Sequence, residues 1–197
     1  MESLSPNPEQ VFHIRTILAV VMGLSLTRLL TGFARIVQHP SRKRIYLVHL
    51  GWGAFLFLTV IHFWWFEFRL THVERWTFVF YFFLICYAAL LFFICSILFP
   101  DHMDEYAGFR DYFHSRQKWF YGLLASIFVV DVVDTLWKGT GYFIALGAQY
   151  SIRQALMFAL AIIAMFVKNK SFHIIFVSGS LIAQVIWILY NYQNLDF

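Results

Sequence analysis

The chain has 197 residues, of which 60% are hydrophobic and 13% are charged, and its formal net charge is +4 at pH 7. A soluble domain carries about 25% charged residues, so this composition excludes an ordinary water-soluble globular domain. The length accommodates six membrane spans of about 20 residues each and leaves no room for a separate soluble domain. We therefore expect residues 1–197 to form a single transmembrane domain.

Six apolar blocks along the chain are each long enough to cross a hydrocarbon core of about 30 Å. They are Val11–Val37, Ile45–Phe66, Trp76–Phe99, Trp119–Trp137, Phe143–Val167 and Phe172–Tyr190. Such long runs lack the alternation of barrel strands, so we predict an all-α integral membrane protein with a bundle of six transmembrane helices. Gly139, Gly141 and Gly147 surround the start of the fifth block and are expected to break or delay that helix.

The distribution of basic residues predicts how the spans are oriented. The first, third and fifth connections carry nine of them: Arg35, Arg42, Lys43, Arg44, Arg110, Arg116, Lys118, Lys168 and Lys170. The opposite side carries four: Arg15, Arg69, Arg75 and Lys138. Connections one, three and five are therefore expected in the cytoplasm, with both termini on the non-cytoplasmic side of the cell membrane.

Residues 100–118, between the third and fourth spans, have the pattern of a short amphipathic helix. Asp101 is a candidate N-cap, and acidic residues precede basic ones along the segment, which complements a helix dipole. The apolar residues that share one face are Met103, Tyr106, Phe109 and Phe113. We predict a helix on the cytoplasmic membrane surface that is a candidate contact for a protein partner. The alternative is a helix packed against the bundle or against a neighbouring subunit.

Polar side chains inside four of the spans fall at a similar depth. At a rise of 1.5 Å per residue, they form one layer in the outer half of the membrane. They are His62 in the second span, Asp131 and Asp134 in the fourth, Arg153 in the fifth and Gln184 in the sixth. A charge at this depth costs at least a few kcal/mol, so it needs a partner or a water-filled cavity.

The two acids and Arg153 allow three interpretations. They are a structural Asp–Arg pair between the fourth and fifth spans, a site for a proton, cation or substrate, or the wall of a hydrated outer vestibule. Because two carboxylates accompany one arginine, one acid remains able to bind and release a proton or to coordinate a cation. We predict an ion, proton or substrate site formed by Asp131, Asp134 and Arg153 and lined by Gln184 and His62.

Arg28 lies inside the first span, and Arg35 follows two helical turns later on the same face. One interpretation is that Arg28 extends its side chain toward lipid phosphates at the inner membrane surface. The other is that the two arginines form a gate or an anion contact.

His49 and His62 lie at opposite ends of the second span. In this respect the span resembles half of the histidine pattern of haem-bearing b-type membrane cytochromes. That resemblance makes His49 and His173 candidate axial ligands of haem b, whereas the second haem would lack a clear partner. The alternative is that these histidines are packed or interfacial side chains. No other cofactor and no metal site is predicted.

These features favour a small channel or transporter for protons or small ions, which forms a homo-oligomer because so short a chain needs several copies to enclose a pore. The alternatives are a non-conducting scaffold or sensor with a structural polar clasp, and a b-type haem protein. The length is similar to that of prokaryotic six-helix potassium channels of the lysosomal type. However, Leu24, Ser25 and Leu26 stand where that family has Phe-Ser-Asp, so no residue role is transferred. No arrangement of catalytic residues and no nucleic-acid signature is recognised.

Overall fold

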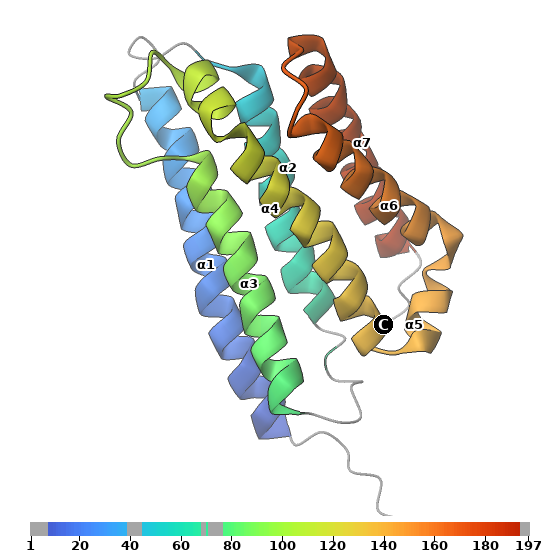
Figure 1. Ribbon diagram of the computed structural model, residues 1–197. Coiled ribbons are helices and arrows are strands. Elements are labelled where there is room, and N and C mark those ends of the chain that lie inside the picture. Colours follow the sequence, from blue (N-terminus) through green and yellow to red (C-terminus); the bar gives the residue numbers. More distant parts are fainter. Residues whose placement is uncertain (1–7, 39–44, 68–69, 71–76, 194–197) are drawn as a thin grey trace, which may run out of the picture.

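The computed structural model describes residues 8–38, 45–67, 70 and 77–193, and all regular structure within these ranges is helical, as the sequence predicts. The helices are α1 (Pro8–Gln38), α2 (Leu47–Phe66), α3 (Phe78–Leu98), α4 (Phe109–Trp137), α5 (Thr140–Ala145), α6 (Gly147–Ala164) and α7 (Lys170–Gln193) (Figure 1). Some residues used above for span ends and orientation lie outside the described residues: Arg42, Lys43, Arg44, Arg69, Arg75 and Trp76.

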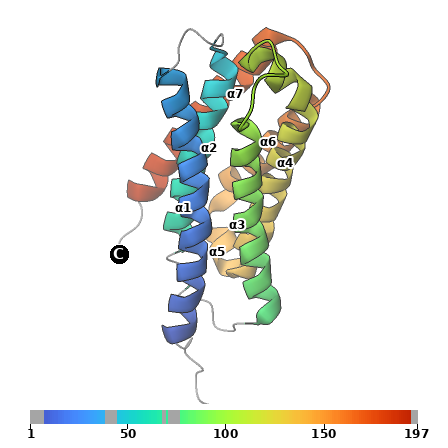
Figure 2. The ribbon, with the colours of Figure 1, turned by 90° about the vertical axis from the view of Figure 1, so that its left-hand side faces the viewer.

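The long helices run alternately in opposite directions along the bundle. In Figure 1, α1, α3 and α6 run upward and α2, α4 and α7 run downward, so the last residues of α1, α3 and α6 lie at the same end as the first residues of α2, α4 and α7. The central helix is α2, which contacts α1, α3, α4 and α7, while α4 lies between α3 and α6. Figure 2 shows α1 and α3 on the near side of the molecule, with α4, α5 and α6 behind α3.

Among the described residues, five helices are long and apolar enough to cross a membrane: α1, α2, α3, α4 and α7. Large apolar side chains such as Phe12, Phe82 and Ile175 are exposed on their surfaces. Lipid accommodates such side chains, whereas exposing many of them to water is unfavourable. These features indicate a multi-pass membrane protein. Helix α6 has 18 residues and is not one of these five, so the predicted count of six spans is not confirmed.

The start of α4 differs from the prediction. Instead of a separate surface helix over residues 100–118, the chain from Phe109 onward forms the first turns of α4, which is continuous over 29 residues. Phe113 is buried because its ring packs against the start of α2, 5.8 Å from the ring of Tyr46 and 6.3 Å from that of His49. From Phe109 onward the segment is therefore part of the bundle, which was the alternative interpretation.

The predicted fifth span, Phe143–Val167, is divided into α5 and most of α6. Gly139 precedes α5 with φ of 132°, and Gly147 begins α6 with φ of 73°. Residues other than glycine rarely adopt these φ values, so the two glycines allow the chain to change direction here. The break expected at this point is confirmed. With 18 residues, α6 is about 27 Å long at the usual helical rise.

A chain of hydrogen bonds crosses the core between α2, α4 and α7. The indole N–H of Trp52 donates to the hydroxyl of Tyr121 at 3.1 Å. That hydroxyl donates to Nδ1 of His173 at 2.8 Å, and Nε2 of His173 donates to the carbonyl of Val167 at 2.8 Å. Each donor has an acceptor when His173 is neutral and carries its proton on Nε2. These hydrogen bonds join the connection between α6 and α7 to the centre of the bundle.

Candidate functional site

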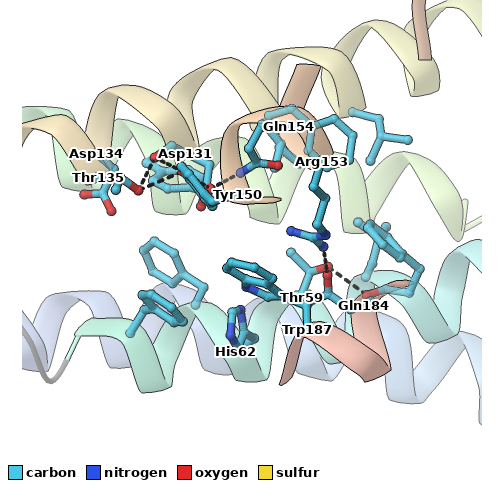
Figure 3. Close-up of a pocket in the computed structure, with 18 residues that line it drawn as sticks. Thr59, His62, Asp131, Asp134, Thr135, Tyr150, Arg153, Gln154, Gln184 and Trp187 are labelled. Carbon is cyan, nitrogen blue, oxygen red and sulfur yellow. Dashed lines mark hydrogen bonds between the residues drawn. The ribbon is translucent and has the colours of Figure 1, made fainter. Parts of the chain in front are cut away.

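A cavity of about 50 Å³ lies between α2, α4, α6 and α7 (Figure 3). A space of this size holds a few water molecules and excludes most organic ligands. Its lining includes every residue predicted for the polar layer: His62, Asp131, Asp134, Arg153 and Gln184. Depth along the helix axis was therefore sufficient to identify residues from four helices that meet at one cavity.

Asp131 is held by three neutral hydrogen-bond donors from two other helices. Its Oδ1 accepts from the hydroxyl of Tyr87 on α3 at 3.0 Å. Its Oδ2 accepts from the hydroxyl of Tyr150 on α6 at 2.7 Å and from the side-chain amide of Gln154. Hydrogen bonds to a charged group contribute about 1.5–3 kcal/mol each. They stabilise the carboxylate beside the cavity without a contacting cation among the described residues.

Asp134 has a different partner, Lys138, which lies one helical turn later at the end of α4. The Lys138 ammonium is 2.7 Å from Oδ2 of Asp134 and 3.0 Å from Oε1 of Glu67, the residue that follows α2. The exposed fractions of the three side chains are 3% for Lys138, 7% for Asp134 and 2% for Glu67. We call these residues the lysine cluster; it joins the end of α2 to the end of α4.

The lysine cluster contains two carboxylates and one ammonium in a region with little water. Desolvation and the nearby Asp134 carboxylate raise the pKa of Glu67 to about 7, against the opposing effects of Lys138 and Arg15. Burial acts to lower the pKa of Lys138, but its two carboxylate partners outweigh this and leave that pKa above its ordinary value. Arg15 of α1 also donates to the backbone carbonyl of Glu67 at 3.3 Å. Lys138 is therefore charged at neutral pH, and Glu67 is close to its titration point.

Arg153 extends toward Gln184 and contacts neither predicted acid (Figure 3). Its Nη2 donates to the amide oxygen of Gln184, and its guanidinium lies 5.5 Å from the centre of a Trp187 ring, a cation–π geometry. None of the ion pairs found within the described ranges involves Arg153. The structural Asp–Arg pair, one of the three interpretations drawn from the sequence, is thus not formed. The next residue, Gln154, contacts Asp131 instead. Successive helical residues point about 100° apart, so Arg153 and Gln154 face different neighbours.

Two nitrogens at the cavity are buried without a hydrogen-bond partner, namely Nε of Arg153 and Nε2 of His62. His62 otherwise packs its ring 4.5 Å from that of Phe66. Buried polar atoms in a space that admits water are commonly satisfied by ordered water molecules. The arrangement is therefore suited to a short hydrogen-bonded water chain that runs between Arg153 and the carboxylates.

Arg28 and Arg35 contact a single acid at the end of α3. Nη1 of Arg28 lies 2.6 Å from Oδ1 of Asp101, and Nη2 of Arg35 lies 4.0 Å from the same oxygen. Arg35 also donates to the carbonyl of Pro100 at 3.4 Å. Half-exposed ion pairs of this kind contribute little stability, about 0–1 kcal/mol. The anion that these arginines contact in the structure is the Asp101 carboxylate of the same chain, and this contact joins α1 to the end of α3.

The candidate haem ligands His49 and His173 lie in the aromatic core. His49 is buried, and its ring packs edge-on against that of Phe99 at 4.9 Å. Both nitrogens of His173 take part in the core chain of hydrogen bonds described above. An axial ligand needs a free nitrogen, so His173 would have to give up one of these bonds to bind iron. This geometry does not favour haem.

Several residues that contact the two aspartates, or that contact Lys138 beside Asp134, are absent from the site predicted from the sequence. They are Glu67, Tyr87, Lys138, Tyr150 and Gln154. Glu67 and Lys138 stand at the ends of apolar blocks, where charges usually face water. The spacing of four residues between Asp134 and Lys138 is the one signal that could have indicated a pair. Nothing in the sequence singles out the tyrosines or Gln154.

The helical bundle, its five helices able to span a membrane and the buried polar cluster indicate a multi-pass membrane protein with an internal polar cavity. No protein-family model, no curated protein and no solved structure matches the chain. The functional conclusion consequently rests on the geometry of the site.

Proposed function

We propose that this chain is a small membrane channel or transporter for protons or small ions and that the ion passes through the polar cavity. The observation that carries the proposal is the position of Asp131. Its carboxylate lines a water-sized space between helices and is stabilised by neutral donors, and no cationic side chain among the described residues contacts it. An acid in this setting is able to exchange a proton or a small ion with water in the cavity.

The other residues of the cavity have secondary roles in this proposal. Asp134, paired with Lys138, provides a second carboxylate toward the end of the bundle. Arg153 adds a positive charge that limits how much cation the cavity accepts, and His62 and Gln184 provide polar groups for water. In this scheme Arg28 and Arg35 act at the opposite end as a gate that Asp101 holds closed.

The proposed membrane arrangement has six spans, with α6 as the fifth. The first, third and fifth connections face the cytoplasm of a cell that carries the protein in its plasma membrane. The last residues of α1, α3 and α6 lie at one end of the bundle (Figure 1), and the basic residues that the sequence places in these connections support this orientation. Because the cavity within one chain is only about 50 Å³, we propose a homo-oligomer in which neighbouring copies complete the path. The α4 start and the segment before it, 100–118, remain the candidate surface for a cytoplasmic protein partner.

Reconstitution into vesicles tests this function. Purified protein is placed in proteoliposomes with an internal pH dye, and proton or potassium gradients are applied in turn. We expect flux from the wild type and a loss of at least tenfold in the double variant Asp131→Asn with Asp134→Asn. Glu105→Gln, an exposed acid, is the matched control and should keep wild-type flux. Unchanged flux in a folded double variant would refute the proposal.

One observation favours a non-conducting scaffold or sensor as a second candidate. The lysine cluster and the bonds of Asp131 join α2, α3, α4 and α6, which is also what a purely structural clasp would do. In that case Asp131→Asn lowers thermal stability, and no preparation of the wild type conducts any ion. The vesicle experiment therefore separates the two candidates.

A further inference from the structure

The lysine cluster leaves two buried acceptor oxygens without a partner, Oε2 of Glu67 and Oδ1 of Asp134. The other oxygen of each carboxylate is bound by the same ammonium, that of Lys138. If both acids were ionised, the cluster would hold a net negative charge and two unsatisfied charged oxygens in a site from which water is nearly excluded. A buried charged oxygen without a partner costs several kcal/mol, so this charge state is strongly disfavoured.

The groups around the cluster do not donate a hydrogen bond to either of the two unpartnered oxygens. Arg15 donates to the backbone of Glu67 rather than to its carboxylate in the bond that the structure shows. Asp131, one turn before Asp134, adds another negative charge. The titratable groups that face the cluster from the packed helices are Arg15 on α1, His62 on α2, Tyr87 on α3, Asp131 on α4, and Tyr150 and Arg153 on α6.

A metal ion is not a suitable counter-charge. The ammonium of Lys138 already occupies the position between the two carboxylates and would repel a second cation there. No group of three or more metal-ligating side chains is found within the described part of the chain. A proton satisfies the same need, because it neutralises one carboxylate and converts an unpartnered acceptor into a donor.

We propose that Glu67, Asp134 and Lys138 form a proton-binding site that holds one proton at neutral pH, shared between the two acids, with the lysine charged. The proton belongs mainly to Glu67, since Asp134 has the shorter contact with the ammonium. The burial that raises the pKa of Glu67 to about 7 agrees with this assignment. Because Asp134 also lines the cavity, the site stores a proton at its edge. This transport role rests on the proposed function, whereas the presence of the proton does not.

Infrared spectroscopy of the purified protein in lipid nanodiscs tests the site directly, because a protonated carboxyl group has a carbonyl band distinct from that of a carboxylate. In the wild type we expect one such band, which shifts in heavy water and disappears as the pH rises through neutrality. This experiment needs no variant. A spectrum without that band on the acidic side of neutrality would overturn the proposal.

Variants assign the band. Glu67→Gln should abolish it, because the remaining Asp134 pairs alone with Lys138. Lys138→Met should strengthen it and retain it at higher pH, since both acids then lack an ammonium. Glu105→Gln should leave it unchanged. A band that survives Glu67→Gln but is lost in Asp131→Asn would place the proton elsewhere and refute the site. A neutral-pH band in a protein that shows no flux in vesicles would refute the transport function and leave the proton site standing.

Discussion

Lys138 and Asp134 are joined by a 2.7 Å contact across one turn of chain, and both side chains are almost fully buried. The same ammonium reaches Glu67 on the neighbouring helix end at 3.0 Å. One lysine therefore compensates two acids, and the charge state of the three residues is set jointly. The stability of this end of the bundle and its response to pH both follow from that arrangement.

Lys138→Met should be strongly destabilising. Removing one partner of a buried ion pair costs about 3–5 kcal/mol, because the remaining charge has no compensation. Thermal unfolding in detergent measures the loss. The loss should be larger at basic than at acidic pH, because at acidic pH the two carboxylates take up protons and no longer need a counter-charge. Lys168→Met, at an exposed position, is the control. An unfolding midpoint equal to that of the wild type at basic pH would show that the cluster contributes nothing.

Glu67 determines a second prediction, the pH dependence of stability. Its folded-state pKa of about 7 lies above its ordinary value of 4.5, so the folded protein binds the extra proton between these limits. The contribution is complete below pH 4.5 and is lost as the pH rises to about 7, with a total loss of at most about 3 kcal/mol. Lys138 has no effect in this window, because its raised pKa affects stability only at strongly basic pH.

The measurement is the free energy or midpoint of unfolding across this pH range for wild type and Glu67→Gln. The stability of the wild type minus that of Glu67→Gln should fall as the pH rises across this window, because the other titratable groups, buried histidines included, are present in both proteins. Glu105→Gln should retain the wild-type slope. Parallel slopes in wild type and Glu67→Gln would mean that Glu67 does not titrate in the window.

Tyr150→Phe removes the hydroxyl that donates to Oδ2 of Asp131 at 2.7 Å and lies 2.8 Å from Oγ1 of Thr135. We expect a loss of about 1–3 kcal/mol, because a buried carboxylate oxygen then lacks one donor. The ring and its packing are retained, so the effect reports the hydrogen bond. Tyr81→Phe is the matched control, since its hydroxyl makes no hydrogen bond within the described ranges. Equal thermal midpoints for the two variants would argue against a strong bond at Asp131.

Gly32→Ala tests the contact between α1 and the end of α3. A Cβ at Gly32 would lie 2.2 Å from Cγ of Phe99, and the ring cannot move freely because it also packs against His49. We expect a loss of about 1–3 kcal/mol from this overpacking. Gly23→Ala on the same helix meets no atom within 4 Å, so it should be neutral or stabilise by about 0.5–1 kcal/mol. An unfolding midpoint that falls in Gly32→Ala but does not fall in Gly23→Ala would confirm the contact. Equal changes in the two midpoints would contradict it.

The long helices could be predicted closely because their apolar runs have no other stable state in a membrane. The second span was placed at Ile45–Phe66 and is found at Leu47–Phe66. The start of α4 could not be placed in this way, since Arg110, Asp111 and Arg116 were assigned to a separate surface helix, whereas they form the first turns of the helix that continues into the membrane span. Charges on one side of a helix do not end it when apolar residues on the other side pack against a bundle.

The polar layer was predictable in depth but not in contacts. A constant rise per residue brings Asp131, Arg153 and Gln184 to one level, and the structure places all three at the cavity. Rotation about each helix axis is set by packing between helices, which the sequence does not reveal. For this reason a pair of Asp131 with Arg153 was only one of three interpretations, and the structure instead has the adjacent Gln154 in contact with Asp131.

As the fifth span of the proposed arrangement, a helix as short as α6 should make the protein sensitive to the thickness of its bilayer. At about 27 Å it falls short of a typical 30 Å hydrocarbon core, and the turn at Gly147 prevents α5 from extending it in a straight line. The first amide groups of α6 have no carbonyl partners within the helix and therefore need water or lipid headgroups nearby. Lipids with shorter acyl chains satisfy that need directly, whereas longer chains force the membrane to thin around this side of the bundle. The acyl-chain length of the lipids should thus affect the stability of this side of the bundle independently of pH and ion gradients.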